Sequence, residues 1–190
     1  APIIEKKLEK KIINKIVKPT LFALKKKNID YTGFLYVGLM IKDNQPYLIE
    51  YNVRMGDPEC QVIMPRLKTD LVKIFNAALS NKLNKIKIKW SKNKCMTTVL
   101  CAKGYPNKII SNKVISLEKI QLDQKSFIFH ASTKLKNNFL VSSGGRVLNV
   151  VVLGDSFTKI RDKIIKIIKK INWKYGFFRR DIGWRVINKK

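Results

Sequence analysis

The chain has 190 residues and 45% of them are hydrophobic, which is enough for one domain or two small domains with an apolar core. No apolar run approaches the ~18 residues of a membrane span, and the first residues lack the apolar segment of a signal peptide, so we expect a cytoplasmic protein. Cys60, Cys95 and Cys101 form no C-x-x-C pair, and they indicate neither a disulfide framework nor a zinc site.

The net charge of +27 taken alone suggests nucleic acid or an anionic membrane surface as a partner. However, 33 of the 40 basic residues are lysines, and they are spread along the whole chain, which is typical of a solvated surface. A basic nucleic-acid-binding module is therefore the alternative function. It would need clustered charge, with Trp90, Trp173 and Trp184 as stacking groups.

The first predicted element is a helix from about residue 5 to residue 27. Leu8, Ile12 and Ile16 follow one another at helical spacing, with lysines on the other faces. Pro19 is expected to kink or restart this helix. The pattern favours a surface helix packed on a sheet, with a membrane-binding helix as the other interpretation.

A hairpin is predicted next. Residues 31–41 form an apolar, aromatic-rich strand, residues 42–46 supply turn chemistry, and residues 48–54 alternate as a second strand. Because successive strand side chains point to opposite faces, Glu50, Asn52 and Arg54 should share one face.

These side chains suggest a binding site. A carboxylate and an amide two residues apart offer oxygen ligands suited to Mg²⁺ or Mn²⁺, and Arg54 could bind a phosphate or carboxylate with its two-pronged guanidinium. Gly56 permits a turn that carries Asp57 and Glu59 back toward the strand. For a bare E-x-N-x-R match, the alternative is an ordinary half-exposed strand that runs into a polar loop.

The remaining elements follow in two groups. Residues 65–83 form a second amphipathic helix, and the polar, basic passage 81–93 is read as a connector or short strand rather than a nucleic-acid patch. Residues 95–102, 126–130 and 146–153 are predicted strands, and residues 154–156 cap a last helix whose apolar face runs from Phe157 to Ile171.

The longer string E-Y-N-V-R-M-G-D-P-E-C-Q from Glu50 to Gln61, followed by P-R-L-K-T-D-L, resembles the signature of the phosphoribosylamine–glycine ligases, which are ATP-grasp enzymes. Three further strings, which start at His130, Ser143 and Arg179, resemble the same family: H-A-S-T-K, S-G-G-R-V and R-R-D-I-G-W-R. Ser132 stands where a glycine is expected. His130 is either a hydrogen-bonded polar residue or a catalytic one, and Gly144-Gly145 either a hairpin turn or an anion-binding nest.

The resemblance implies an α+β fold: residues 1–92 as the C-terminal part of an ATP-grasp domain and residues 93–190 as a small β-rich C-terminal domain with a terminal helix. It implies a ligase of purine biosynthesis that uses ATP and Mg²⁺ or Mn²⁺ to join glycine to 5-phosphoribosylamine, with neither a membrane nor a specific nucleic acid as partner. The implied residues are the cofactor-binding Leu48, Glu50 and Asn52, of which Glu50 and Asn52 hold the metal, and the catalytic Arg54, Asp57 and Glu59.

Family members are more than twice as long and carry the glycine-rich loop and nucleotide-binding lysines in their N-terminal half. These features do not occur in the 190 residues, which also begin without Met. We therefore expect a C-terminal portion that needs the missing N-terminal half as a partner and is inactive alone.

Overall fold

The computed structural model describes residues 4–187, which form two compact units. Unit 1 comprises the residues up to Asp57 together with Thr69–Ile88, and unit 2 comprises Pro58–Lys68 and the residues from Lys89 onward. Both units combine helices with antiparallel strands, so the α+β expectation is confirmed. The domain division at residue 92 stays a prediction. No helix within residues 4–187 combines the length and apolar character needed to span a membrane.

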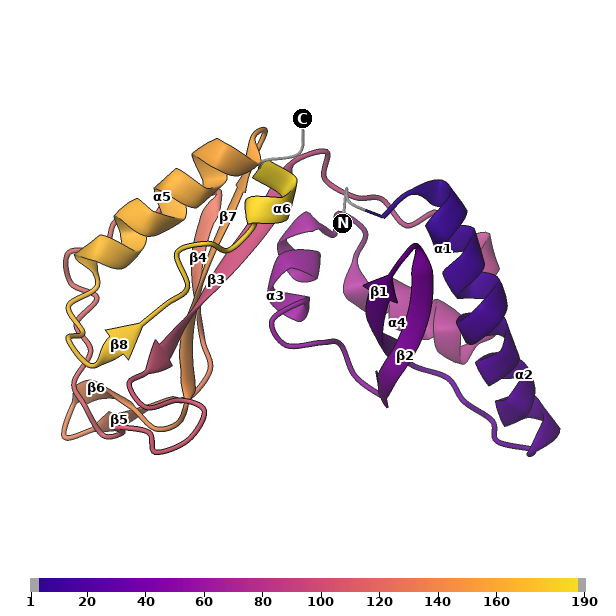
Figure 1. Cartoon of the computed structure of the whole chain (residues 1–190), viewed down its shortest axis with the longest axis horizontal. Coiled ribbons are helices and arrows are strands. Elements are labelled where there is room, and N and C mark those ends of the chain that lie inside the picture. Colours follow the sequence, from indigo (N-terminus) through magenta and orange to yellow (C-terminus); the bar gives the residue numbers. More distant parts are fainter. Residues whose placement is uncertain (1–3, 188–190) are drawn as a thin grey trace. The chain divides into compact units, whose positions relative to one another are not determined.

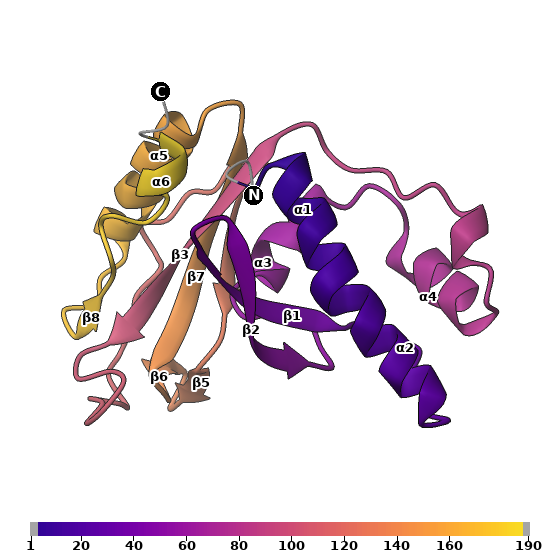
Figure 2. The same cartoon turned by 45° about the vertical axis from the view of Figure 1, so that its right-hand side comes forward.

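Unit 1 begins with a long helical rod, visible in Figure 2. It consists of α1 (Lys6–Ile12), a π-helical segment (Ile13–Val17) and α2 (Lys18–Lys26). Pro19 lies in the first turn of α2, where its missing N–H is tolerated, and the ladder before it adopts π spacing. The helix therefore restarts at the proline, as predicted.

The hairpin of β1 (Tyr36–Lys42) and β2 (Gln45–Asn52) follows. Asp43 and Asn44 connect the strands with φ values of 50° and 54°, which is the backbone of a tight two-residue hairpin turn. The hairpin is confirmed, but its strand bounds are wrong. The first strand begins at Tyr36 rather than residue 31. The second spans Gln45–Asn52 rather than residues 48–54, so Arg54 lies beyond it in a bend.

The predicted helix 65–83 is wrong at its start. Residues 64–66 (Met64–Arg66) form a 3-10 turn that follows the short helix α3 (Cys60–Ile63) in unit 2. The α-helix itself, α4 (Leu71–Leu79), begins later and belongs to unit 1, where a 3-10 turn (Leu83–Lys85) follows it. Asp70 caps α4, because its Oδ1 accepts a hydrogen bond from the backbone N–H of Lys73 at 2.9 Å. Phe75 of α4 meets Phe34 edge to face, with 5.9 Å between ring centroids.

Unit 2 is built on an antiparallel sheet with the strand order β4-β7-β3-β8. The strands are β3 (Lys94–Ala102), β4 (Ser126–His130), β7 (Arg146–Gly154) and β8 (Gly176–Phe177). Helix α5 (Phe157–Lys170) contacts β7 and β3 and lies along the sheet, as Figure 1 shows. The three long strands and the helix are confirmed. Ser156 occupies the N-cap position of α5, but its side chain makes no capping hydrogen bond.

The core of the described chain lies mainly in unit 2. The apolar face of α5 packs on the central strand β7, which is buried from Val147 to Leu153. The members of this core with the lowest exposure are Ala102, Val147, Leu148, Val150, Val152, Ile160 and Ile164. In unit 1, the described apolar side chains that are buried are Leu8, Ile16 and Ala77.

The small elements of unit 2 complete the fold. A hairpin of β5 (Thr133–Lys136) and β6 (Phe139–Ser142) was not predicted. Its turn consists of Asn137 and Asn138, with φ values of 49° and 63°. Near the C-terminus, the one-turn helix α6 (Trp184–Ile187) contacts α5.

Candidate functional site

Glu50 and Asn52 lie next to each other at the end of β2. The Asn52 amide Nδ2 donates a hydrogen bond to Glu50 Oε1 at 3.0 Å. This contact requires both side chains to be on the same face of the strand, which confirms the face predicted from alternation. Glu50 is exposed, so its carboxylate is open to a ligand, and Asn52 is half-buried beside it.

Both side chains fit a divalent cation. Their oxygens are the hard ligands that Mg²⁺ and Mn²⁺ prefer, and two protein ligands leave room for water and phosphate oxygens in the shell. Asn52 now presents its N–H₂ group to Glu50, so an ion shared by both residues would need the amide turned over. Within residues 4–187, no three His, Cys, Asp or Glu side chains form a cluster that could hold a metal by themselves.

The other predicted site residues of unit 1, Leu48, Arg54 and Asp57, lie before and after this pair in the sequence. Leu48 lies on β2 opposite Leu39 and is 43% exposed. Arg54 is exposed, and its Nη1 donates a hydrogen bond to the carbonyl oxygen of Met55 at 2.9 Å. Because β2 ends at Asn52, alternation does not place Arg54 on the face of Glu50. Asp57 is exposed in the turn that follows.

Glu59 belongs to unit 2, unlike the other five predicted site residues. It stands before the first turn of α3, where its carbonyl oxygen accepts hydrogen bonds from the N–H groups of Val62 and Ile63 at 3.1 Å each. The backbone of Glu59 is therefore held in place by the start of helix α3.

The strings that start at His130 and Ser143 meet in unit 2. Ser132 N–H donates to Arg146 O at 3.0 Å, and Ser143 N–H donates to Ser132 O at 2.8 Å. Gly144 and Gly145 form a bend between β6 and β7. The His130 ring Nδ1 lies 2.9 Å from Thr133 Oγ1, which agrees with a hydrogen-bonded polar residue.

The string that starts at Arg179 contains an ion pair between two of its own residues, Arg179 and Asp181. The Arg179 guanidinium donates two hydrogen bonds to the Asp181 carboxylate, at 3.0 and 2.6 Å. This pairing lowers the pKa of Asp181 and raises that of Arg179. Arg185 lies over the Trp184 ring, 4.7 Å from its centroid. The Arg179 fork thus has a partner within its own loop.

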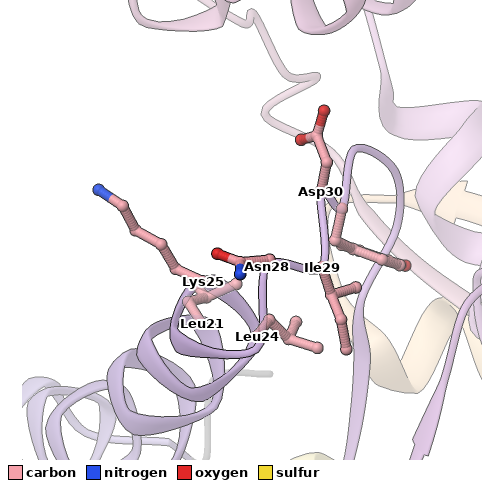
Figure 3. Close-up of a pocket in the computed structure, with 7 residues that line it drawn as sticks. Leu21, Leu24, Lys25, Asn28, Ile29 and Asp30 are labelled. Carbon is pink, nitrogen blue, oxygen red and sulfur yellow. The ribbon is translucent and has the colours of Figure 1, made fainter.

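An open depression of about 510 Å³ lies at the end of α2 in unit 1. Figure 3 shows the apolar side chains of Leu24 and Ile29 pointing to the same side, with Asp30 pointing away from them. Leu21, Lys25, Asn28 and Tyr31 complete its lining. None of the predicted site residues contributes to it.

Sequence reasoning did not single out Gly38. It lies on β1 directly opposite Glu50 in the register of the hairpin. The signal was present, because a lone glycine inside an apolar strand marks a bulge or a close approach of another group.

Two family models match the chain in succession. The model described as "Phosphoribosylglycinamide synthetase, ATP-grasp (A) domain" matches residues 1–60. The model described as "Phosphoribosylglycinamide synthetase, C domain" matches residues 95–185. The first match includes β1, β2 and the Glu50–Asn52 pair, and the second includes the sheet of unit 2 with α5.

Curated relatives match nearly the whole chain. A phosphoribosylamine–glycine ligase of Brucella melitensis is 37% identical over 191 residues, which cover 100% of this chain and 45% of the relative. One of Agrobacterium fabrum is 40% identical over 187 residues, which cover 98% of this chain and 44% of the relative. The chain therefore spans less than half the length of the curated relatives it matches.

A solved structure gives the same result. The crystal structure of a phosphoribosylamine–glycine ligase from Thermotoga maritima is similar with a TM-score of 0.77 and 31% sequence identity, over 95% of this chain and 44% of that one. The fold expected from the resemblance, part of an ATP-grasp domain followed by a β-rich domain, is confirmed by this match and by the two family models. The chain belongs to the phosphoribosylglycinamide synthetase family, of which it carries part of the ATP-grasp domain and the C domain.

Proposed function

We propose that this chain supplies the metal-binding hairpin and the C domain of an ATP-dependent ligase that joins glycine to 5-phosphoribosylamine, a step of purine biosynthesis. The observation that carries the proposal is the contact of Glu50 with Asn52, in a chain whose relatives are named phosphoribosylamine–glycine ligases. We assign residues 1–92 to the ATP-grasp part and residues 93–190 to the C-terminal domain. The rest of the enzyme is the partner of this chain.

The proposed reaction has two steps. A carboxylate oxygen of glycine attacks the γ-phosphorus of ATP, and the bond from that phosphorus to the bridging oxygen breaks, which gives glycyl phosphate and ADP. The amine nitrogen of 5-phosphoribosylamine then attacks the carbonyl carbon. It loses a proton as phosphate leaves, and the product is glycinamide ribonucleotide.

Glu50 and Asn52 would hold Mg²⁺ or Mn²⁺ through one carboxylate oxygen and one amide oxygen. A divalent ion at this place would supply charge neutralisation for the nucleotide phosphates during transfer. The role of the two residues is to fix the position of the phosphates relative to the hairpin. Leu48, exposed on the same strand, is proposed as an apolar contact for the nucleotide.

Arg54, Asp57 and Glu59 would act on the substrates. Arg54 is exposed, and its guanidinium suits the phosphate of glycyl phosphate or of the ribose substrate. Asp57 and Glu59 would accept hydrogen bonds from the amine of 5-phosphoribosylamine and orient it for attack. Holding the reacting groups in place is the main source of rate in such a transfer.

The test joins this chain to the part of the Brucella melitensis ligase that it does not match. The joined protein should support growth of a purine-requiring strain that lacks the ligase. The purified protein should release ADP over many turnovers only when glycine and 5-phosphoribosylamine are both present. Glu50→Gln should lower the rate at limiting Mg²⁺ by at least about tenfold, since even groups that only support a metal ligand contribute 10–100-fold.

Asp43→Asn is the matched control. It also replaces a carboxylate by an amide in the same hairpin, and asparagine tolerates the positive φ of 50° at this turn. Normal growth and normal Mg²⁺ dependence of a Glu50→Ala, Asn52→Ala double variant would overturn the metal assignment. Equal losses in Asp43→Asn and Glu50→Gln would show a general effect of charge instead.

The 190-residue polypeptide by itself should release no ADP from ATP in the presence of both substrates. Simultaneous positioning of nucleotide and acceptor contributes on the order of 7–11 kcal/mol, and most of this is lost when one side of the site is missing. Turnover near that of the joined protein would refute this account of the active site.

A further inference from the structure

Gly38 and Glu50 approach each other closely across the hairpin. They are direct partners in the register of β1 and β2. A methyl group on the Gly38 Cα would lie 2.9 Å from Cγ of Glu50 and 3.4 Å from its carbonyl oxygen. Two carbon atoms in ordinary contact are about 3.5–4.0 Å apart, so the Glu50 side chain occupies the space that any side chain at residue 38 would need.

A β-bulge produces this pairing. The turn at Asp43 and Asn44 pairs Lys42 with Gln45, and the register continues regularly to Leu39 opposite Leu48. The next pair is Gly38 with Glu50, so Ile49 is the extra residue. Without that extra residue, Glu50 would lie opposite Val37 and not opposite a glycine. Bulges of this kind turn a side chain to a new direction and are frequent next to active sites.

The backbone of Gly38 does not itself require glycine. The φ of Gly38 lies outside the left-handed region in which other residues are strained. Glycine also weakens a strand interior, because it loses more conformational freedom on folding and packs no side chain. The observed feature that accounts for glycine at this position is the room it leaves for Glu50.

We propose that Gly38 is a positioning residue for the Glu50 carboxylate. With no side chain at residue 38, the Glu50 Cγ occupies the place that a Cβ of residue 38 would crowd, and Glu50 Oε1 reaches the Asn52 amide at 3.0 Å. The smallest side chain, that of alanine, forces the Glu50 Cγ to move and turns the carboxylate away from Asn52. This inference rests on the proposed role of Glu50 and Asn52 in holding a metal, and adds a third residue that decides their geometry.

The test uses the joined protein described above, with Gly38→Ala, Glu50→Ala and the double variant. Gly38→Ala should raise the Mg²⁺ concentration for half-maximal rate by about tenfold, the lower end of what supporting residues contribute at metal sites. Most of kcat should return at saturating Mg²⁺. In the Glu50→Ala background, where no Cγ remains, Gly38→Ala should change neither the rate nor the Mg²⁺ dependence further.

A second measurement separates positioning from folding. Hydrogen exchange of the β1 and β2 amides should be at least as slow in the double variant as in Glu50→Ala, because alanine then meets no obstacle and favours the strand. Faster exchange in the double variant would show that the backbone needs glycine, which overturns the proposal.

The two possible failures are distinguishable. If Glu50→Ala raises the Mg²⁺ concentration for half-maximal rate while Gly38→Ala leaves it unchanged, the positioning role is wrong and the proposed function stands. If Glu50→Ala itself leaves the Mg²⁺ dependence unchanged, the metal assignment fails, and the role of Gly38 fails with it.

Discussion

Ser132 and Gly144 are in such close contact that a substitution at one should depend on the residue at the other. A methyl group on Gly144 would lie 2.6 Å from Oγ and 2.7 Å from Cβ of Ser132. Ser132 cannot easily move away, because its N–H is bonded to Arg146 O and its carbonyl oxygen to Ser143 N–H. Rotation of the hydroxyl relieves the first contact but not the second.

The magnitude follows from two opposing effects. Gly144→Ala removes freedom from the unfolded chain, which stabilises by about 0.4–1 kcal/mol where the backbone allows alanine, and the φ of Gly144 is outside the left-handed region. Crowding in a packed site costs about 1–3 kcal/mol. The net effect should be a loss of roughly 1–2 kcal/mol. In a Ser132→Gly background the crowding disappears, so the same substitution should stabilise by about 0.4–1 kcal/mol.

Urea unfolding followed by tryptophan fluorescence measures this directly, since Trp90, Trp173 and Trp184 all belong to unit 2. Ser132→Ala is the matched control: it keeps Cβ and removes Oγ, so Gly144→Ala should remain destabilising beside it. The reasoning fails if the two effects are additive, that is, if Gly144→Ala changes the unfolding free energy equally beside serine and beside glycine.

Three further predictions concern the stability and chemistry of unit 2. Ile164 is 1% exposed on the face of α5 that packs on the sheet, so Ile164→Ala should lower the unfolding free energy by about 2–5 kcal/mol. Urea midpoints equal to wild type would contradict this core. The hydrogen bond from the Lys163 ammonium holds the pKa of Asp123 at about 2. The difference in unfolding free energy between wild type and Asp123→Asn should therefore be complete above the ordinary pKa of 3.8 and should vanish as the pH falls to about 2. A difference that grows on acidification would contradict this. Burial raises the pKa of the Cys95 thiol to about 11. Maleimide near neutral pH should therefore label Cys95 far more slowly in the folded chain than in urea, as measured by mass spectrometry of the labelled peptide. Equal labelling rates would contradict the burial of Cys95.

The elements that the sequence predicted well are those with local causes. Helix α5 follows from its repeating isoleucines, and the four buried ones, Ile160, Ile164, Ile167 and Ile168, stand at helical spacing. The hairpin of unit 1 follows from Asp43 and Asn44, whose side chains tolerate the positive φ that the turn demands. The hairpin β5–β6 was not predicted, although Asn137 and Asn138 carry the same turn signal. The sequence therefore contained the information needed to predict it.

The helix predicted at 65–83 failed for a different reason. Leu67 forms a β-bridge with Trp90, and Lys68 N–H donates to Lys89 O at 2.9 Å. The Arg66 Nε also donates to Asn93 O at 3.1 Å. These partners lie more than twenty residues away in sequence, and they hold the backbone extended where the local pattern favours a helix. Tertiary contacts of this kind override propensity, and a pattern within one window cannot show them.

The predictions about the site also differ according to whether they depend on local sequence or on tertiary contacts. Alternation within one strand was sufficient to bring Glu50 and Asn52 together, because it requires knowledge of that strand alone. The place of Gly38 depends on the pairing between two strands, and the turn predicts this pairing only as far as Leu39. Beyond that residue the bulge shifts every partner by one. A local pattern can thus name the residues that would hold a metal and can mark Gly38 as a place of close approach. The pairing of Gly38 with Glu50 is found only from the register of the folded hairpin.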